Sequence, residues 1–310
     1  MLVTGGAGFV GANLVRRLSD LGADVRATLH VKDAVIADER VDYVRCDLTR
    51  AEDCASVCQG VDYVFLCAAV TAGAGMMESK PLFLLTPNVM MSMLMLEAAY
   101  EAKVKKVLFI SSNTVYPVTD HPVKEDEVTG EFFEKYFIAG WLKRFCEATC
   151  EMYATKIKDP MKVVVVRPAN IYGPYDDFEW ATSHVLPALI RRVVERHDPI
   201  QVWGDGQDIK DFIYVEDFVA GMLLAMEKID TFEHINLASG REHRLCDMLE
   251  LILELDGYTD ARIEYDVTKP TMIPKRLIDP AKAQRLLGFQ ATTPIETGMQ
   301  KTLDWYRSTL

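Results

Sequence analysis

Short apolar runs alternate with longer amphipathic runs through the first two-thirds of the chain. The short runs are rich in β-branched and aromatic residues, which favours strands, and the longer runs repeat their apolar positions at helical spacing. This alternation is typical of a parallel sheet with helices on both faces. The predicted strands are 2–4, 24–29, 43–47, 63–67, 107–111 and 163–167. The predicted helices are 10–21, about 53–59, 88–103 and about 138–154.

Right-handed crossovers between such strands build a doubly wound, Rossmann-type sheet. After Arg167 the pattern changes, because the Pro- and Gly-rich segment "RPANIYGPYDDF" leads into an amphipathic helix at 185–195 and then into short mixed elements. A last helix is predicted near 294–306. We therefore expect an α/β chain with an NAD(P)-binding Rossmann domain at 1–170, to which the chain returns near 205–240. A smaller mixed α/β domain for substrate binding is predicted at 171–310.

Composition narrows the class of protein. The net charge of −12 argues against nucleic acid and against an anionic membrane surface as partners. The most apolar helical stretch contains Asn, Ser and Glu, and we expect it to be too short to span a bilayer. Seven cysteines without a C-x-x-C pair indicate reduced thiols, and the first strand begins almost at Met1, so no signal peptide is predicted. We expect a cytoplasmic protein without a metal site.

The segment "LVTGGAGFVGANLVRRL" predicts a strand, a glycine loop and a helix. Its spacing matches G-x-G-x-x-G in the context that gives this motif weight, between an apolar strand and an amphipathic helix. Glycines permit the turn and let backbone N–H groups approach a pyrophosphate at the helix N-terminus. The predicted cofactor contacts of this loop are Gly5, Gly8, Phe9, Val10 and Gly11.

The ends of the next strands predict the adenosine side of a dinucleotide site. Leu29 stands where an NAD site usually carries an acid, and His30 and Lys32 follow it. A basic group there accepts a 2′-phosphate, which mildly favours NADP, with NAD as the alternative and solvated loop residues as the other interpretation. Asp47 is predicted to accept the adenine amino group, with the Leu48 amide beside it. Small residues after the fourth strand, Ala68 and Ala69, leave room for the cofactor.

At this point the chain resembles the extended short-chain dehydrogenase/reductases, the NAD(P)-dependent epimerase/dehydratase family that acts on nucleotide sugars. The resemblance covers nearly the whole length, and its nearest subfamily is the GDP-L-fucose synthases. Besides the glycine loop, the motifs that carry it are "SSNTVYP", "RPANIYGP", "SHVLPALIRR", "VWGDGQDIKDFIYVEDF" and "KPTMIPKRLID".

The resemblance implies a role for individual residues. Ser112 falls on the position whose hydroxyl binds the reacting sugar oxygen, Thr114 on a substrate-facing position that is a cysteine in the subfamily, and His184 on its general acid. Each also has a plain structural interpretation, such as a strand end for Ser112 or a helix N-terminus for His184. The remaining implied contacts are Pro168 and Ala169 with the cofactor, and Asn170, Arg192, Trp203 and Lys210 with the substrate.

The stretch "YFIAGWLK" departs from the family pattern. Members carry Tyr-x-x-x-Lys on one helix face, where the lysine binds the nicotinamide ribose and lowers the pKa of the tyrosine. Here Lys143 fits the lysine position, because Glu147 follows it by four residues, and this alignment leaves Ala139 at the tyrosine position. If Tyr136 were the tyrosine, Gly140 would replace the lysine. On a continuous helix Tyr136 and Lys143 would lie about 10.5 Å apart along the axis.

Two functions from different classes remain at this stage. The first is an NAD(P)-dependent oxidoreductase, epimerase or dehydratase that exchanges hydride at C4 of a nucleotide-diphospho-sugar, with GDP-sugars favoured. Its acid or base would be atypical, with Thr114, His184 and Tyr136 as candidates. The alternative is a non-catalytic NAD(P)-binding sensor or partner protein of the same fold. The resemblance also implies a homodimer through helices 88–103 and 138–154.

Overall fold

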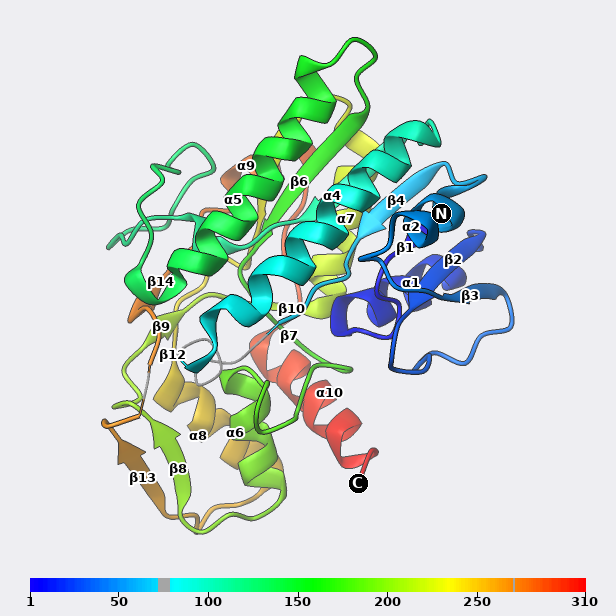
Figure 1. Ribbon diagram of the computed structural model, residues 1–310. Helices are drawn as coiled ribbons and strands as arrows, with labels where there is room; N and C mark the ends of the chain where they lie inside the picture. The colour runs from blue at the N-terminus through cyan, green and yellow to red at the C-terminus, as the bar shows by residue number, and fades with distance from the viewer. Residues whose placement is uncertain (72–78, 270) are drawn as a thin grey trace.

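A seven-stranded parallel sheet lies at the centre of the computed structural model, which describes residues 1–71, 79–269 and 271–310 (Figure 1). The strand order is β11-β6-β5-β4-β1-β2-β3. The strands are β1 (Leu2–Val3), β2 (Val25–Leu29), β3 (Val41–Arg45), β4 (Tyr63–Leu66), β5 (Lys106–Ile110), β6 (Lys162–Pro168) and β11 (Glu233–Leu237). The predicted doubly wound fold and its six strands are confirmed. The order reverses between β1 and β4, which is where such sheets bind ligands.

Helices cover both faces of the sheet, as the apolar strands require. Four consecutive valines, 163–166 in β6, point alternately into the two cores, because both faces of this strand are buried. One face is covered by α2 (Ala51–Cys58), α4 (Leu85–Glu101) and α5 (Phe137–Glu151), and the other by α1 (Phe9–Asp20), α7 (Val215–Lys228) and α9 (Ala281–Leu287). In Figure 1, α4 and α5 run side by side across the sheet.

Helix α4 begins three residues before the predicted helix. Pro87 lies in its first turn, where a missing N–H costs no hydrogen bond, so proline does not delay the start. The helical run from Leu82 to Glu101 is long and apolar enough to cross a membrane by length and composition, so the expectation that it is too short was wrong. Asn88, Met95 and Leu96 of this run are nevertheless buried in the core of the chain itself.

The second part of the chain has its own apolar core. Around this core lie α6 (Val185–Val194), β8 (Ile200–Trp203), α8 (Leu245–Asp256), β13 (Ile263–Asp266) and α10 (Ile295–Arg307). Short strands join the two parts: β7 (Asn170–Tyr172) pairs with β10 (Phe212–Tyr214), and β9 (Ile209–Lys210) lies between β12 (His243–Arg244) and β14 (Lys275–Arg276). The domain boundary near residue 170 stays a prediction, and Pro270 of the motif "KPTMIPKRLID" lies outside the described residues.

A buried ionic network joins α5 to the sheet. The Glu147 carboxylate accepts hydrogen bonds from Arg167 Nε at 2.8 Å and Ser111 Oγ at 2.6 Å. Burial would raise the pKa of Glu147, but Arg167 outweighs it and lowers this pKa to about 2. His234 in β11 has its Nε2 3.7 Å from Glu147, and within the described residues that nitrogen has no hydrogen-bond partner. Burial, followed by the charge of Arg167, lowers the pKa of His234 to about 4.

His234 should make the fold acid-sensitive. The unfolded chain binds a proton at this side chain near pH 6.5 and the folded chain only near pH 4, so the free energy of unfolding should fall by about 3 kcal/mol across that interval. Above pH 6.5 both states are neutral and the contribution is constant. Urea unfolding of the wild type and His234→Gln at pH 7 and pH 4.5 measures the difference. The exposed His121→Gln variant removes a histidine whose pKa Glu127 raises, so it should lose at least as much stability as the wild type. A loss in His234→Gln equal to that of the wild type would contradict the assignment.

Candidate functional site

The glycine loop leaves an open helix N-terminus at the edge of the sheet. Gly5 has a φ of +69°, and a side chain on Gly11 would place its Cβ 2.1 Å from the Gly5 carbonyl oxygen. Helix α1 has no capping side chain and no acid in its first turn, so its first backbone N–H groups, at Phe9, Val10 and Gly11, remain available to an anion. The loop therefore fits the pyrophosphate of a dinucleotide.

The end of β4 is held beside this loop by a side chain that the sequence patterns did not single out. Thr4 Oγ1 accepts hydrogen bonds from the backbone N–H groups of Cys67 and Ala68, both at 2.9 Å. Asn88 fixes the chain at Val70. Its side-chain oxygen accepts a hydrogen bond from the Val70 N–H, and its side-chain nitrogen donates to the Val70 carbonyl, both at 2.9 Å. Ala68 lies against Gly5, where a larger residue would clash. Ala68, one of the two predicted small residues, therefore borders the loop.

Basic groups gather at the carboxyl ends of β2 and β3. His30 and Lys32 are exposed there, and Arg45, which sequence reasoning missed, donates to the His30 carbonyl at 2.6 Å and pairs with Asp33. In the parallel pairing of β2 with β3, Arg45 is the partner of Leu29. Pairing the ends of these two strands could have identified Arg45 as a residue of this edge. Asp47 lies at the same edge. Its carboxylate accepts hydrogen bonds from Thr49, which lower its pKa and keep it ionised.

The two predicted hydroxyl residues meet at the end of β5. Ser112 Oγ accepts hydrogen bonds from the Thr114 backbone N–H at 3.1 Å and from Thr114 Oγ1 at 3.0 Å. Because this oxygen accepts twice, its own hydrogen is left for an outside acceptor. Asn113 between them donates to the Pro168 carbonyl at 3.1 Å, which ties the turn to β6, immediately before Ala169.

Lys143 reaches the same strand end from α5. Its ammonium donates to the Ile110 carbonyl at 2.8 Å and lies 4.9 Å from the centre of the Phe109 ring. Burial lowers the pKa of Lys143. One turn earlier, a side chain on Gly140 would meet the Phe132 ring at 2.6 Å and the Thr114 carbonyl oxygen at 2.9 Å. Helix α5 therefore touches the Ser112–Thr114 turn directly, and Ala139 in its first turn is half-buried.

Tyr136 points to a different group of residues. It precedes α5, and its phenol interacts with the Ile273 backbone and with the charges of Arg276 and Asp208. Burial raises the pKa of Tyr136 to about 12, so the phenol is protonated at neutral pH. The structure thus brings Lys143, Ser112 and Thr114 together at β5, whereas Tyr136 faces the segment that contains β14.

Basic side chains are buried around that segment. Lys210 donates to the Ile273 carbonyl and lies 3.3 Å from Asp208, and Asn170 donates its amide to the Asp211 carbonyl at 2.9 Å. Arg276, which sequence reasoning missed, donates to the carbonyls of Pro117 and Tyr116, while its buried Nε finds no partner in the part of the chain that the structure describes. The position of Arg276 depends on the pairing of β9 with β14, which no sequence pattern predicted.

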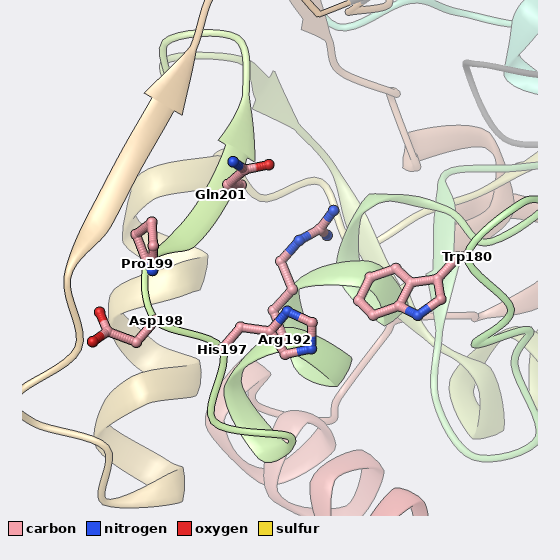
Figure 2. Close-up of a pocket in the computed structure, with 6 residues that line it drawn as sticks. All are labelled: Trp180, Arg192, His197, Asp198, Pro199 and Gln201. Atoms are coloured by element: carbon pink, nitrogen blue, oxygen red, sulfur yellow. The ribbon is translucent and has the colours of Figure 1, made fainter.

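Arg192 lies beside a cavity at the far end of α6 (Figure 2). Its guanidinium lies 4.8 Å from the centre of the Trp180 ring, and that of Arg191 lies 4.3 Å from it. Arg191 is paired with Glu195, whereas Arg192 has no carboxylate partner among residues 1–71, 79–269 and 271–310. His184 lies exposed at the other end of the same helix, as its N-cap, and Trp203 is partly exposed in β8.

Comparisons with known proteins agree with this geometry. The model of the NAD dependent epimerase/dehydratase family matches residues 1–238. GDP-L-fucose synthase 1 of Arabidopsis thaliana is 31% identical over 99% of this chain and 92% of its own length. The structure of UDP-glucose 4-epimerase from Thermotoga maritima, solved with UDP-glucose, aligns with a TM-score of 0.88 at 27% identity over 99% of this chain and 98% of that one.

A further solved structure contains a dinucleotide. MoeE5 in complex with UDP-glucuronic acid and NAD aligns with a TM-score of 0.86 at 25% identity, covering all of this chain and 99% of that one. The open α1 N-terminus at the switch point of the sheet and the family match over most of the chain lead to the same conclusion. The chain belongs to the NAD dependent epimerase/dehydratase family and is an NAD(P)-dependent enzyme of nucleotide-sugar chemistry.

Proposed function

We propose that the chain exchanges hydride at C4 of a GDP-linked sugar, as an oxidoreductase, epimerase or dehydratase with an altered acid–base group. The meeting of Lys143, Ser112 and Thr114 at the end of β5 carries this proposal, because it supplies a ribose contact and a hydroxyl donor within one turn. The GDP preference rests on the relatives named GDP-L-fucose synthase. The dinucleotide, when bound, supplies or accepts the hydride.

Each residue then has a definite task. Ser112 donates its free hydrogen to the sugar oxygen, and Lys143 holds the nicotinamide ribose. As Ser112 passes its proton to the sugar oxygen, Thr114 passes its own to Ser112 Oγ over 3.0 Å and takes a replacement from solvent. This path is more direct than one through Tyr136, whose phenol faces Arg276. His184 remains the candidate for exchange with solvent, because it is exposed.

For the cofactor we propose NADP, with NAD as the alternative. His30, Lys32 and Arg45 give the ribose end a positive character that suits a 2′-phosphate, although Arg45 is partly neutralised by Asp33. The cofactor preference can be measured by comparing the turnover rate with NADPH and with NADH in the 340 nm assay described below for Ala139→Tyr.

A GDP-sugar should stabilise the protein through Arg192. At a concentration about 100 times the dissociation constant, it should raise the melting temperature by about 5 °C. Arg192→Ala should abolish this shift, because the only carboxylate-free guanidinium that we find on described α6 residues is lost. Differential scanning fluorimetry measures the effect, and Arg285→Ala, at an exposed residue of α9, serves as the matched control. No shift with any nucleoside diphosphate or nucleotide sugar would refute the proposed substrate class.

Restoring a phenol at Ala139 should accelerate turnover. A tyrosine one helical turn before Lys143 would have its pKa lowered by the ammonium and would return to the acid–base position of the family. We expect Ala139→Tyr to raise kcat about a hundredfold, measured as the absorbance change at 340 nm with a 4-keto nucleotide sugar. Ala139→Phe, which adds the ring without the hydroxyl, should give no gain. Equal rates for the two variants would show that proton transfer does not pass through this position.

The loss of the tyrosine also supports a second candidate, a non-catalytic NAD(P)-binding sensor of the same fold. In that case the dinucleotide would bind at the glycine loop without turnover of any sugar nucleotide. Absorbance at 340 nm together with chromatographic analysis of the sugar nucleotide, with the wild type and with Ala139→Tyr, separates the two, because a sensor neither consumes NAD(P)H nor converts the sugar.

We further propose a cytoplasmic homodimer through α4 and α5. Phe137, Trp141 and Phe145 follow one another at four-residue spacing on α5 and are 57%, 49% and 50% exposed. Leu82 and Phe83 before α4 are likewise exposed. A second copy would cover this apolar stripe, which also explains why so apolar a helix as α4 need not enter a membrane.

Breaking the stripe should yield a monomer. Trp141→Arg places a charge in the proposed contact, so light scattering should report half the wild-type mass at micromolar concentration. Val267→Arg, at a side chain that is 73% exposed and away from both helices, should remain dimeric. A monomeric wild type would refute the dimer.

A further inference from the structure

A cavity of about 320 Å³ lies where the loop that follows β7 meets the C-terminal ends of α6 and α10. This volume lies in the range of small-molecule sites. Its lining includes Asp176, Phe178, Glu179, Arg191, Glu195 and Tyr306. The cavity shares no lining residue with the one beside Arg192, so it is separate from the substrate contacts proposed above.

One carboxyl group in this lining is only half satisfied. Asp176 is 8% exposed, and its Oδ1 accepts the Asp177 backbone N–H at 2.7 Å. Its Oδ2 is buried and has no hydrogen-bond partner in the part of the chain that the structure describes. A buried carboxylate in this condition is unfavourable unless a donor or a cation meets it. Burial raises the pKa of Asp176 to about 8, so without a counterion the group keeps its proton at neutral pH.

Arg191 does not serve as that counterion. Its Nε donates to Glu195 at 2.9 Å, and its Nη1 donates to the Phe178 carbonyl at 2.8 Å. Glu195 also accepts from the Tyr306 hydroxyl at 3.0 Å, and Glu179 is an exposed acid at the same cavity. Among the described lining residues, three acids thus stand against one base, and the base is already paired. The charges favour a cation as the occupant.

The aromatic walls favour an organic cation over a metal ion. Phe178 and Tyr306 are stacked with their ring centres 4.2 Å apart, and the ring centre of Trp305 lies 5.8 Å from that of Phe178. Aromatic rings attract an ammonium group and pack against hydrocarbon. A hard metal ion needs several oxygen ligands, and the described residues contain no group of three or more His, Cys, Asp or Glu side chains that could hold one.

We propose that this cavity is a binding site for an organic ammonium ion. Asp176 is its counterion, and the rings of Phe178, Trp305 and Tyr306 contact its hydrocarbon part. Because the cation pairs with the ionised carboxylate, the proton that Asp176 holds passes to solvent when the ammonium binds. The inference is independent of the sugar-nucleotide chemistry, because the two cavities have separate linings.

Isothermal titration of the full chain with benzylammonium and n-butylammonium tests the site. Benzyl alcohol, which has the shape of the first amine without its charge, should bind at least about tenfold more weakly. At pH 7 the binding of either amine should release about one proton, measured from the dependence of the heat on the ionisation enthalpy of the buffer. Affinity should rise by close to tenfold from pH 6.5 to pH 7.5, because the cation displaces a proton from Asp176.

Other titratable and charged groups surround Asp176 and need a control. The pKa of Glu195 is lowered by Tyr306, His197 and Arg191 against the effect of burial, and burial raises the pKa of Tyr306 to about 12, so neither titrates in this range. The other neighbours are Asp177, Glu179, Arg191 and, 3.3 Å from Glu195, His197. Asp176→Asn leaves all of them in place, so proton release should disappear in this variant if Asp176 is its source.

The variants separate the charge from the rings. Asp176→Asn should bind both amines about tenfold more weakly, and Phe178→Leu about threefold more weakly. Asp260→Asn, at an exposed residue, should match the wild type. Wild-type affinity in Asp176→Asn, equal binding of benzyl alcohol and benzylammonium, or no binding of either amine would each overturn the inference. The proton count of the wild type provides the test if Asp176→Asn does not fold.

Discussion

The buried pair between Glu147 and Arg167 fixes the helix that carries Lys143 onto the sheet that carries the hydroxyl turn. Both side chains are almost fully buried, so neither charge is solvated by water, and removing one partner of such a pair typically costs about 3–5 kcal/mol. Arg167 also donates to the Tyr116 hydroxyl, which donates to Asn236 in β11. Three neighbouring strands and α5 thus share one hydrogen-bond network, and the position of the Lys143 ammonium depends on it.

Much of the first part of the chain could be predicted from the sequence, because its elements are held by local patterns. The valines of β6 and the glycines after β1 have the same meaning in any doubly wound sheet. The second part gave weaker signals. The two-residue strand β9 exists only because β12 and β14 flank it, so the burial of Lys210 and the place of Arg276 follow from tertiary pairing. Thr4 was missed because its role is to hold a loop that is distant in sequence.

Cofactor binding and proton transfer are separable in this fold. The cofactor side depends on backbone geometry, such as the open α1 N-terminus, and tolerates little change, because a Cβ on Gly11 has no room. The proposed proton-transfer side depends on single side chains, and Ala139, in the first turn of α5, has none that can carry a proton. The phenol of Tyr136 contacts the segment around Ile273.

Gly140 sets how closely α5 can approach the hydroxyl turn. A side chain at this position would collide with the Thr114 carbonyl oxygen and the Phe132 ring, so the close approach needs glycine. Carrying Tyr136 to the place of Ala139 would need a shift of three residues, about 4.5 Å. Ala139→Tyr would instead place a phenol one helical turn before Lys143, at the distance from the hydroxyl turn that Gly140 allows.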